Sequence, residues 1–240
     1  MSGSATMPGH AMVLAAGLGL RMRPLTERTP KPLIPVAGRS MLDRVFDRLD
    51  EAGVPHRVVN THWLADQIAR HLAGHSGVIL SHEGVPLDTG GGVAQALPLL
   101  GLQPFFVCNA DIIWLDGERP ALNRLAEAWD AARMDALLLL TPVGRAFGYD
   151  GAGDFFHADD GRLQWRGDAS TAPFVFTGVQ ILHPRLFADA PDGGFSLNLL
   201  YYRAQATRRL FGLVHDGDWL HIGTPEALTA AESWFAARED

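Results

Sequence analysis

Residues 14–35 read LAAGLGLRMRPLTERTPKPLIP and carry the strongest local signal in the chain. The apolar residues 11–14 predict a short buried strand that runs into a loop containing Gly17 and Gly19. Glycine allows such a loop to adopt positive φ and to approach a ligand closely. Against the single anion Glu27, the stretch carries four cations, namely Arg21, Arg23, Arg28 and Lys31. Backbone N–H groups beside fixed cations predict a phosphate-binding loop.

Lys31 is the only lysine in a chain with 20 lysines and arginines. A composition so biased toward arginine would place arginine at any indifferent surface position. Lys31 lies between Pro30 and Pro32 in a predicted loop, and loops carry functional residues more often than the framework does. We therefore expect Lys31 to serve a site that needs a compact ammonium rather than a planar guanidinium.

Length and composition indicate a globular protein with one good core. The 240 residues include a single cysteine, Cys108, which excludes a disulfide framework and a cysteine zinc site. A net charge of −7 argues against a nucleic-acid-binding face. No apolar run is long enough to span a bilayer. Residues 1–9 are small and polar, lack the apolar core of a signal peptide, and predict a flexible leader on a cytoplasmic protein.

Strand-like and helix-like patterns alternate along residues 10–142. Strands are predicted at 11–14, 54–60, 78–81, 105–108 and 136–140. Helices are predicted between them, at 41–49 after an N-cap at Ser40, and at 63–72, 88–100 and 122–133. This alternation predicts an α/β fold with a doubly wound, mainly parallel, Rossmann-like sheet.

The composition and the hydrophobic pattern of the sequence change after Pro142. Glycines, aromatic residues and short strand-like runs at 154–158, 162–165 and 174–182 predict a smaller antiparallel lid over about 143–206. A helix at 197–206, a returning strand at 210–214 and a closing helix at 225–237 follow. We expect a single domain over 10–240, made of a nucleotide-binding core (10–142), this lid, and the returning strand and closing helix (207–240).

Asp111 follows the apolar strand 105–108, at the sheet edge where ligands of such folds bind. The loops after Leu14, Ser81 and Cys108 are expected to converge there. A carboxylate at this edge can hold Mg²⁺, which takes one or two carboxylates together with phosphate oxygens. An isolated aspartate after a strand is more often a cap, but beside a phosphate loop we expect a metal ligand.

The motif LAAGLGLRMRPLT followed by PKPL resembles the signature of the sugar-1-phosphate nucleotidyltransferases, also called nucleoside-diphosphate-sugar pyrophosphorylases. Segments SHEGVPLDTGGG (81–92), NAD (109–111), GDF (153–155) and FTGVQILHP (176–184) resemble segments of this family in order. The resemblance implies an enzyme that joins an NTP and a sugar-1-phosphate into an NDP-sugar and releases pyrophosphate. The same segments favour UTP with N-acetylmuramate-1-phosphate, in cell-wall recycling, and GTP with mannose-1-phosphate is the alternative.

The resemblance also implies roles for the residues of the phosphate loop. Arg21 would stabilise the leaving pyrophosphate, and Lys31 would hold the α-phosphate together with the sugar phosphate. Asp111 would bind Mg²⁺, with Mn²⁺ as the alternative metal. The backbone around the nucleotide would be that of Leu14, Ala16, Gly17 and Gly19.

The base and the sugar would be read by later segments. Glu83 would face the base, with Gly90 and Gly91 allowing close approach. A carboxylate suits the N3–H of uracil and the N1–H and amine of guanine alike, so chemistry alone leaves UTP and GTP open. Sugar contacts are implied for Asn109, Gly148, Gly153, Asp154, Thr177 and Gly178. The lactyl carboxylate of N-acetylmuramate would need a cation, for which the candidates are Arg145, Arg162 and Arg166.

The chain departs from the family at its second metal position. The family has an aspartate in a W-x-D-x-G-T segment, but residues 219–224 read WLHIGT and place His221 there. Imidazole is a poor ligand for Mg²⁺. Asp111 alone could hold the metal, Asp216 or Asp218 could replace the missing carboxylate, or His221 could bind a softer metal or a phosphate. We favour the first, and a packed His221 without a metal role is about as well supported as any role for it.

Two other protein classes compete with this reading. A dinucleotide-binding dehydrogenase needs a third glycine in G-x-G-x-x-G, and Met22 stands at that position. A non-catalytic sugar-nucleotide sensor would account for His221, but Arg21, Lys31 and Asp111 together favour an enzyme. The expected partners are an NTP and a sugar-1-phosphate, without nucleic acid or membrane, for a monomer or small homo-oligomer.

Overall fold

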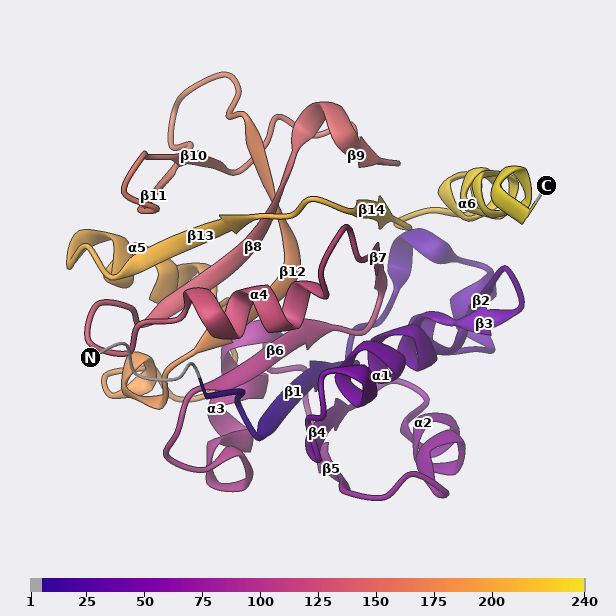
Figure 1. Ribbon diagram of the computed structural model, residues 1–240. Helices are drawn as coiled ribbons and strands as arrows, with labels where there is room; N and C mark the ends of the chain where they lie inside the picture. Colours follow the sequence, from indigo (N-terminus) through magenta and orange to yellow (C-terminus); the bar gives the residue numbers. More distant parts are fainter. Residues whose placement is uncertain (1–5, 240) are drawn as a thin grey trace.

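A nine-stranded mixed sheet forms the centre of the computed structural model, which describes residues 6–239 (Figure 1). Its strands are β1 His10–Leu14, β4 His56–Thr61, β5 Val78–His82, β6 Phe105–Asn109, β8 Ala136–Pro142, β10 Phe155–His157, β11 Leu163–Trp165, β12 Phe174–Leu182 and β13 Leu210–Val214. The order across the sheet is β11-β10-β12-β6-β1-β4-β5, and β8 pairs with β12 and β13. Of the leader expected at 1–9, residues 1–5 lie outside the described residues, whereas Met7 packs against the core and Pro8 is buried.

The parallel strands of the sheet position the loops that follow β1, β5 and β6. Strands β6, β1, β4 and β5 run parallel, and the register places Leu14 beside both Asn60 and Asn109. The carboxyl ends of these strands therefore lie at one edge. The four strands expected here, at 11–14, 54–60, 78–81 and 105–108, are all present within two residues of their expected ends.

Strand β12 lies elsewhere than the sequence suggested. Residues 174–182 were expected in an antiparallel lid, but β12 runs antiparallel between β6 and β8 inside the main sheet. Both faces of β12 are covered, since Val179 and Ile181 belong to one core cluster and Leu182 to the other. Of the runs expected in the lid, β10 and β11 form the antiparallel hairpin at the end of the sheet.

Helices cover both faces of the sheet, which confirms the doubly wound α/β class (Figure 1). On β1, Ala11 and Val13 face the cluster that includes residues of α1, α2 and α4, while Met12 faces the cluster of α3 and α5. This alternation follows from the two-residue period of a strand. The helices are α1 Met41–Glu51, α2 Ala65–Leu72, α3 Asp88–Leu100, α4 Ala121–Ala128, α5 Asn198–Ala206 and α6 Pro225–Glu239. Ser40 caps α1 as expected, because its hydroxyl accepts from the Asp43 N–H at 3.0 Å.

A second, three-stranded sheet crosses the carboxyl edge of the first. It is built from β7 Ile112–Leu115, β14 Asp218–His221 and β9 Ala146–Phe147, in the order β7-β14-β9. The antiparallel register pairs His221 with Ile112, the residue that follows Asp111. Two short strands, β2 Pro35–Val36 and β3 Arg39–Ser40, and five 3₁₀ turns complete the described elements: η1 Leu20–Met22, η2 Leu25–Glu27, η3 Lys31–Leu33, η4 Val143–Arg145 and η5 Pro184–Phe187. No helix within residues 6–239 combines the length and the apolarity that crossing a bilayer requires.

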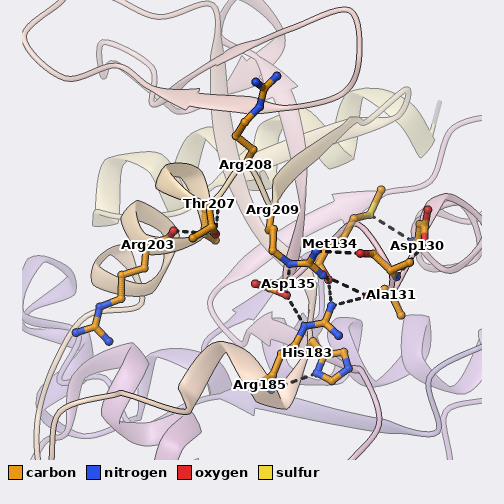
Figure 2. A network of polar contacts seen from close by, with 12 residues as sticks. Asp130, Ala131, Met134, Asp135, His183, Arg185, Arg203, Thr207, Arg208 and Arg209 are labelled. Carbon is orange, nitrogen blue, oxygen red and sulfur yellow. Dashed lines mark hydrogen bonds and ion pairs between the residues drawn. The ribbon is translucent and has the colours of Figure 1, made fainter.

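Two arginines anchor the loop after α4 at the amino ends of β8 and β13 (Figure 2). Arg185 Nε and Arg209 Nε both donate to Asp135 Oδ1, at 2.5 and 2.8 Å. Each guanidinium also donates to the main-chain oxygens of Ala131 and Met134. The cluster lies at the edge opposite the carboxyl ends of the parallel strands, so its arginines support the fold and not the site described next.

Candidate active site

A cleft of about 520 Å³ lies at the carboxyl ends of β1, β5 and β6, where the three loops were expected to converge. Its walls bring together nine of the residues singled out from the sequence: Leu14, Ala16, Gly17, Gly19, Arg21, Lys31, Glu83, Asn109 and Asp111. Those residues span almost 100 positions in sequence, and the parallel register of the strands is what places them on one wall.

The loop after β1 has the geometry of an anion-binding turn. Gly19 is left-handed (φ +61°) and is followed by the 3₁₀ turn η1. Residues 16–21 find no acceptor for their backbone N–H groups within the described part of the chain. Thr26 Oγ1 donates to Gly19 O at 2.8 Å and fixes the turn. A left-handed residue followed by right-handed ones points successive N–H groups into one concavity, which suits phosphate oxygens.

Lys31 and Asp111 meet at the centre of the cleft. The distance from Lys31 Nζ to Asp111 Oδ2 is 2.7 Å, and the lysine is only 7% exposed. Pro30 and Pro32 flank Lys31, which is the first residue of the turn η3. Asp111 sits between the end of β6 and the start of β7 and keeps its second carboxylate oxygen without a partner among the described residues.

His221 is brought to this pair by the second sheet. Burial lowers the pKa of His221 most, and the nearby charges of Lys31 and Arg21 lower that pKa further. The imidazole is therefore neutral at pH 7 and can offer a lone pair. Gly223 leaves room for the ring, because a Cβ at residue 223 would lie 2.8 Å from His221 Nε2.

Neither Asp216 nor Asp218 lies where it could take the place of the second metal carboxylate that the resemblance implied. Asp216 pairs with Arg124 at 2.7 Å, and Asp218 lies 3.6 Å from Arg238. Neither side chain lines the cleft. Residues 6–239 contain no group of three or more His, Cys, Asp or Glu side chains that could hold a metal ion.

Glu83 lines the cleft, is buried, and accepts hydrogen bonds from neutral donors. Its exposure is 2%. Asn60 Nδ2 donates to one carboxylate oxygen at 2.6 Å, and the Leu87 N–H donates to the other at 3.0 Å. A carboxylate oxygen accepts more than one hydrogen bond, so Glu83 retains acceptor capacity toward the cleft.

The structure does not bring Gly90 and Gly91 to the cleft wall. Their N–H groups donate to Phe195 O at 2.8 and 3.0 Å. A Cβ on Gly90 would lie 2.3 Å from the Phe195 ring, and one on Gly91 would lie 2.4 Å from Gly193 O. These glycines accommodate the 193–195 segment against the start of α3, and the expectation that they approach a base is not supported by their position.

A second hollow of about 430 Å³ adjoins the cleft and shares Arg21 and Gly223 with it. Gly148 and His221 line it, together with Tyr149, which the sequence did not single out. The Tyr149 ring lies edge-on to His221, with ring centroids 6.2 Å apart. Tyr149 could have been noticed because it directly follows Gly148 in the expected lid.

Four of the residues expected at the sugar line neither cavity. Thr177 is fully buried, and its hydroxyl donates to Leu139 O at 2.9 Å. Gly178 (φ +87°) makes room for Asn109, whose Nδ2 would lie 2.8 Å from a Cβ there. Gly153 (φ +77°) packs on Ala172 O.

Asp154, just before β10, is likewise bound within the protein. It accepts from the Phe176 N–H at 2.9 Å, and burial raises the pKa of its carboxyl. Of these four residues, Gly178 contacts a residue that lines the cleft, Asn109.

The three arginines considered for a substrate carboxylate are engaged elsewhere. Arg145 donates to Asp216 O and Gly217 O, and Arg162 pairs with Asp160. Arg166 donates to Gly153 O and Ala169 O. Arg21 is the lysine or arginine that lines the second hollow in the described part of the chain.

Comparison with known proteins defines the class of this protein. The model of the MobA-like NTP transferase domain family matches residues 11–218, and the chain belongs to this family. The resemblance drawn from the sequence motifs and the expected nucleotidyltransferase class are thereby confirmed.

Individual proteins similar to this chain are mostly sugar-1-phosphate nucleotidyltransferases. The chain is 43% identical over 236 residues to N-acetylmuramate alpha-1-phosphate uridylyltransferase of Caulobacter vibrioides, covering 95% of this chain and 98% of that protein. The protein of the same name from Neisseria meningitidis serogroup B is 35% identical, with 93% and 99% covered. Mannose-1-phosphate guanylyltransferase catalytic subunit beta of Drosophila pseudoobscura pseudoobscura is 28% identical, and the match covers 60% of it. The crystal structure of HddC from Yersinia pseudotuberculosis shares the fold, with a TM-score of 0.75 at 23% identity and 94% and 99% coverage.

Proposed function

We propose that this protein transfers the uridylyl group of UTP to N-acetylmuramate-1-phosphate and releases pyrophosphate. The observation that carries the proposal is the 43% identity to the Caulobacter uridylyltransferase over 95% of the chain. The cleft supports it, because a buried lysine, a carboxylate and backbone N–H groups without an acceptor in the described part of the chain meet there. A role in cytoplasmic cell-wall recycling follows from that substrate pair and is part of the proposal.

The reaction is an in-line displacement at phosphorus. An oxygen of the sugar phosphate attacks the α-phosphorus of UTP, the bond from the α-phosphorus to the bridging oxygen breaks, and pyrophosphate leaves. Such chemistry depends on positioning and on neutralising charge. Lys31 holds the α-phosphate and the incoming phosphate, and Arg21 together with the N–H groups of residues 16–21 holds the β- and γ-phosphates.

A divalent metal, Mg²⁺ in the proposal and Mn²⁺ in the alternative, would neutralise phosphate charge when bound. Asp111 fits it, since one carboxylate oxygen is without a protein partner among the described residues and Mg²⁺ commonly takes one or two carboxylates with the phosphates as further ligands. His221 would add a ligand only for a softer metal.

The sugar is proposed to occupy the second hollow. Gly148, Tyr149 and His221 line it, and Arg21 joins it to the cleft. Aromatic rings there suit the apolar face of a pyranose, and the base is proposed to lie at Glu83. Asn109 is proposed to face the sugar phosphate side, because it lines the cleft beside Asp111.

A grid of nucleotides and sugar phosphates tests the proposal by pyrophosphate release. UTP with N-acetylmuramate-1-phosphate is expected to give the highest kcat/KM, above UTP with N-acetylglucosamine-1-phosphate, which lacks the lactyl carboxylate. GTP with mannose-1-phosphate is the second candidate, favoured by the 28% identity to a guanylyltransferase. Higher kcat/KM for that pair would overturn the proposal.

A further inference from the structure

Asn60 joins two of the loops that form the cleft. It is the fifth residue of β4, with Leu14 of β1 on one side and Ser81 of β5 on the other. Its exposure is 3%. Asn60 Oδ1 accepts from the Ala15 N–H at 2.7 Å, and Asn60 Nδ2 donates to Glu83 Oε1 at 2.6 Å. One side chain therefore binds the start of the phosphate loop and the buried carboxylate at the same time.

The chemistry at residue 60 requires an amide. The main-chain N–H of Ala15 needs an acceptor and the carboxylate of Glu83 needs a donor, and asparagine supplies one of each from a single planar group. Because the two partners differ in kind, the orientation of the amide is defined. Aspartate would keep the first bond and lose the second.

The surroundings of this bridge are closely packed. Gly92 of α3 packs on it, since a Cβ at residue 92 would lie 2.6 Å from Glu83 Oε1 and 2.8 Å from Asn60 Nδ2. Leu87 N–H fixes the other oxygen of Glu83 at 3.0 Å. Within residues 6–239 the donors to Glu83 are neutral, and a buried carboxylate held in this way depends strongly on each of them.

We infer that Asn60 is a positioning residue for nucleotide binding: it orients the Glu83 carboxylate toward the base and ties it to the phosphate loop at Ala15. This inference rests on the proposed placement of a nucleotide in the cleft. The consequence is that the base and the phosphates are held in a fixed mutual register. Asn60 also lines the cleft, so the test must separate action through Glu83 from direct contact with the nucleotide. A change that acts through Glu83 leaves the sugar phosphate unaffected.

A double-mutant cycle tests this dependence. Asn60→Asp puts a carboxylate oxygen at 2.6 Å from Glu83 Oε1, and two carboxylates that close cannot both stay ionised in place. In the Glu83→Gln background the conflict disappears, because the glutamine amide can donate to the carboxylate introduced at residue 60. We expect N60D to raise the KM for UTP at least about tenfold with Glu83 present and less than about threefold in the E83Q protein, the non-additivity expected within one hydrogen-bond network.

The KM for the sugar phosphate separates positioning of the nucleotide from a general loss of structure. The KM for the sugar phosphate should stay within about twofold of wild type in all variants. Gln95→Glu is the matched control, because this exposed amide donates to Ser81 and His82 O without lining the cleft. It should leave both KM values unchanged. If N60D does not fold, Asn60→Ser takes its place in the cycle.

The nucleotide is chosen by calorimetry on the wild type from UTP, GTP, ATP and dTTP, so the cycle does not depend on UTP being the substrate. Preference for another nucleotide would overturn the proposed substrate, and the cycle would still support or overturn the role of Asn60 with that nucleotide. Equal effects of N60D in both backgrounds, or equal rises in both KM values, would overturn the inference. Binding of no nucleotide would overturn both.

Discussion

Replacing Lys31 by alanine removes the ammonium that lies 2.7 Å from Asp111 Oδ2. The side chain is 8% exposed, so little solvent screens its charge. Its proposed partners in the reaction are the α-phosphate and the attacking phosphate, and both gain or redistribute charge in the transition state. The substitution therefore removes an interaction that is stronger in the transition state than in the ground state, and it should lower kcat more than it affects binding.

The size of the effect follows from Coulomb's law and from comparable donors. Two unit charges about 4 Å apart interact by about 4 kcal/mol at an effective dielectric constant near 20. Removing one preorganised transition-state donor typically costs about 2.7–4 kcal/mol, or about 10²–10³ in kcat. We expect Lys31→Ala to lower kcat by about that factor, while the KM for UTP changes less than about threefold, because Arg21 and the loop N–H groups remain.

Pyrophosphate release at saturating sugar phosphate, with UTP varied, separates kcat from KM. Arg28→Ala is the control, since Arg28 is an exposed cation of the same loop and does not line the cleft. A kcat within threefold of wild type, or a KM for UTP that rises as far as kcat falls, would refute the role of Lys31. Lys31→Arg should also be impaired, because a planar guanidinium does not replace a compact ammonium in a closed pocket.

Three further predictions concern stability and reactivity. Gly90→Ala should lower the free energy of unfolding by about 1–3 kcal/mol in urea titrations, because its Cβ would lie 2.3 Å from the Phe195 ring, and an unchanged midpoint would contradict that packing. Burial lowers the pKa of His215, whose Nε2 bonds Leu115 O at 3.0 Å, so the unfolded chain takes up a proton below about pH 6.5 that the folded chain does not. The contribution of His215 to the free energy of unfolding should therefore be complete above that pH and should decrease as the pH drops toward 5. In a His215→Asn variant, the free energy of unfolding should decrease less over the same pH range. Burial raises the pKa of Cys108 to about 12, so a thiol reagent at pH 8 should label it only in denaturant, and rapid labelling of the folded protein would be inconsistent with its burial.

Sequence reasoning succeeded where the signal is local. The strand at 11–14, the glycine loop, the prolines around Lys31 and the N-cap at Ser40 each act within a few residues, and each is present as expected. The convergence of Asp111 with that loop followed from the general rule for parallel sheets. Local sequence patterns were therefore enough to predict that Asp111 lies beside a loop about 90 residues earlier in the chain.

The remaining features depend on partners distant in sequence. Strand β12 reads as a strand in either location, and only its pairing with β6 and β8 places it inside the main sheet. Gly90 and Gly178 were expected to contact a ligand, and the neighbours that exclude a side chain at these positions, Phe195 and Asn109, are more than 60 residues away in sequence. Asn60 carries no motif, and its importance appears only once Ala15 and Glu83 are seen on either side of it.

The single lysine has a practical consequence for the chemistry of this protein. Reagents that acylate side-chain amines, amine-directed crosslinkers and lysine-modifying enzymes have one side-chain target in the whole chain, and that target is Lys31, 7% exposed and paired with a carboxylate. Coupling to a solid support through lysine would therefore either fail or block the cleft. The same property makes the ε-amine a built-in reporter, because the rate of its acylation would follow how often the cleft opens and how fully a nucleotide covers it.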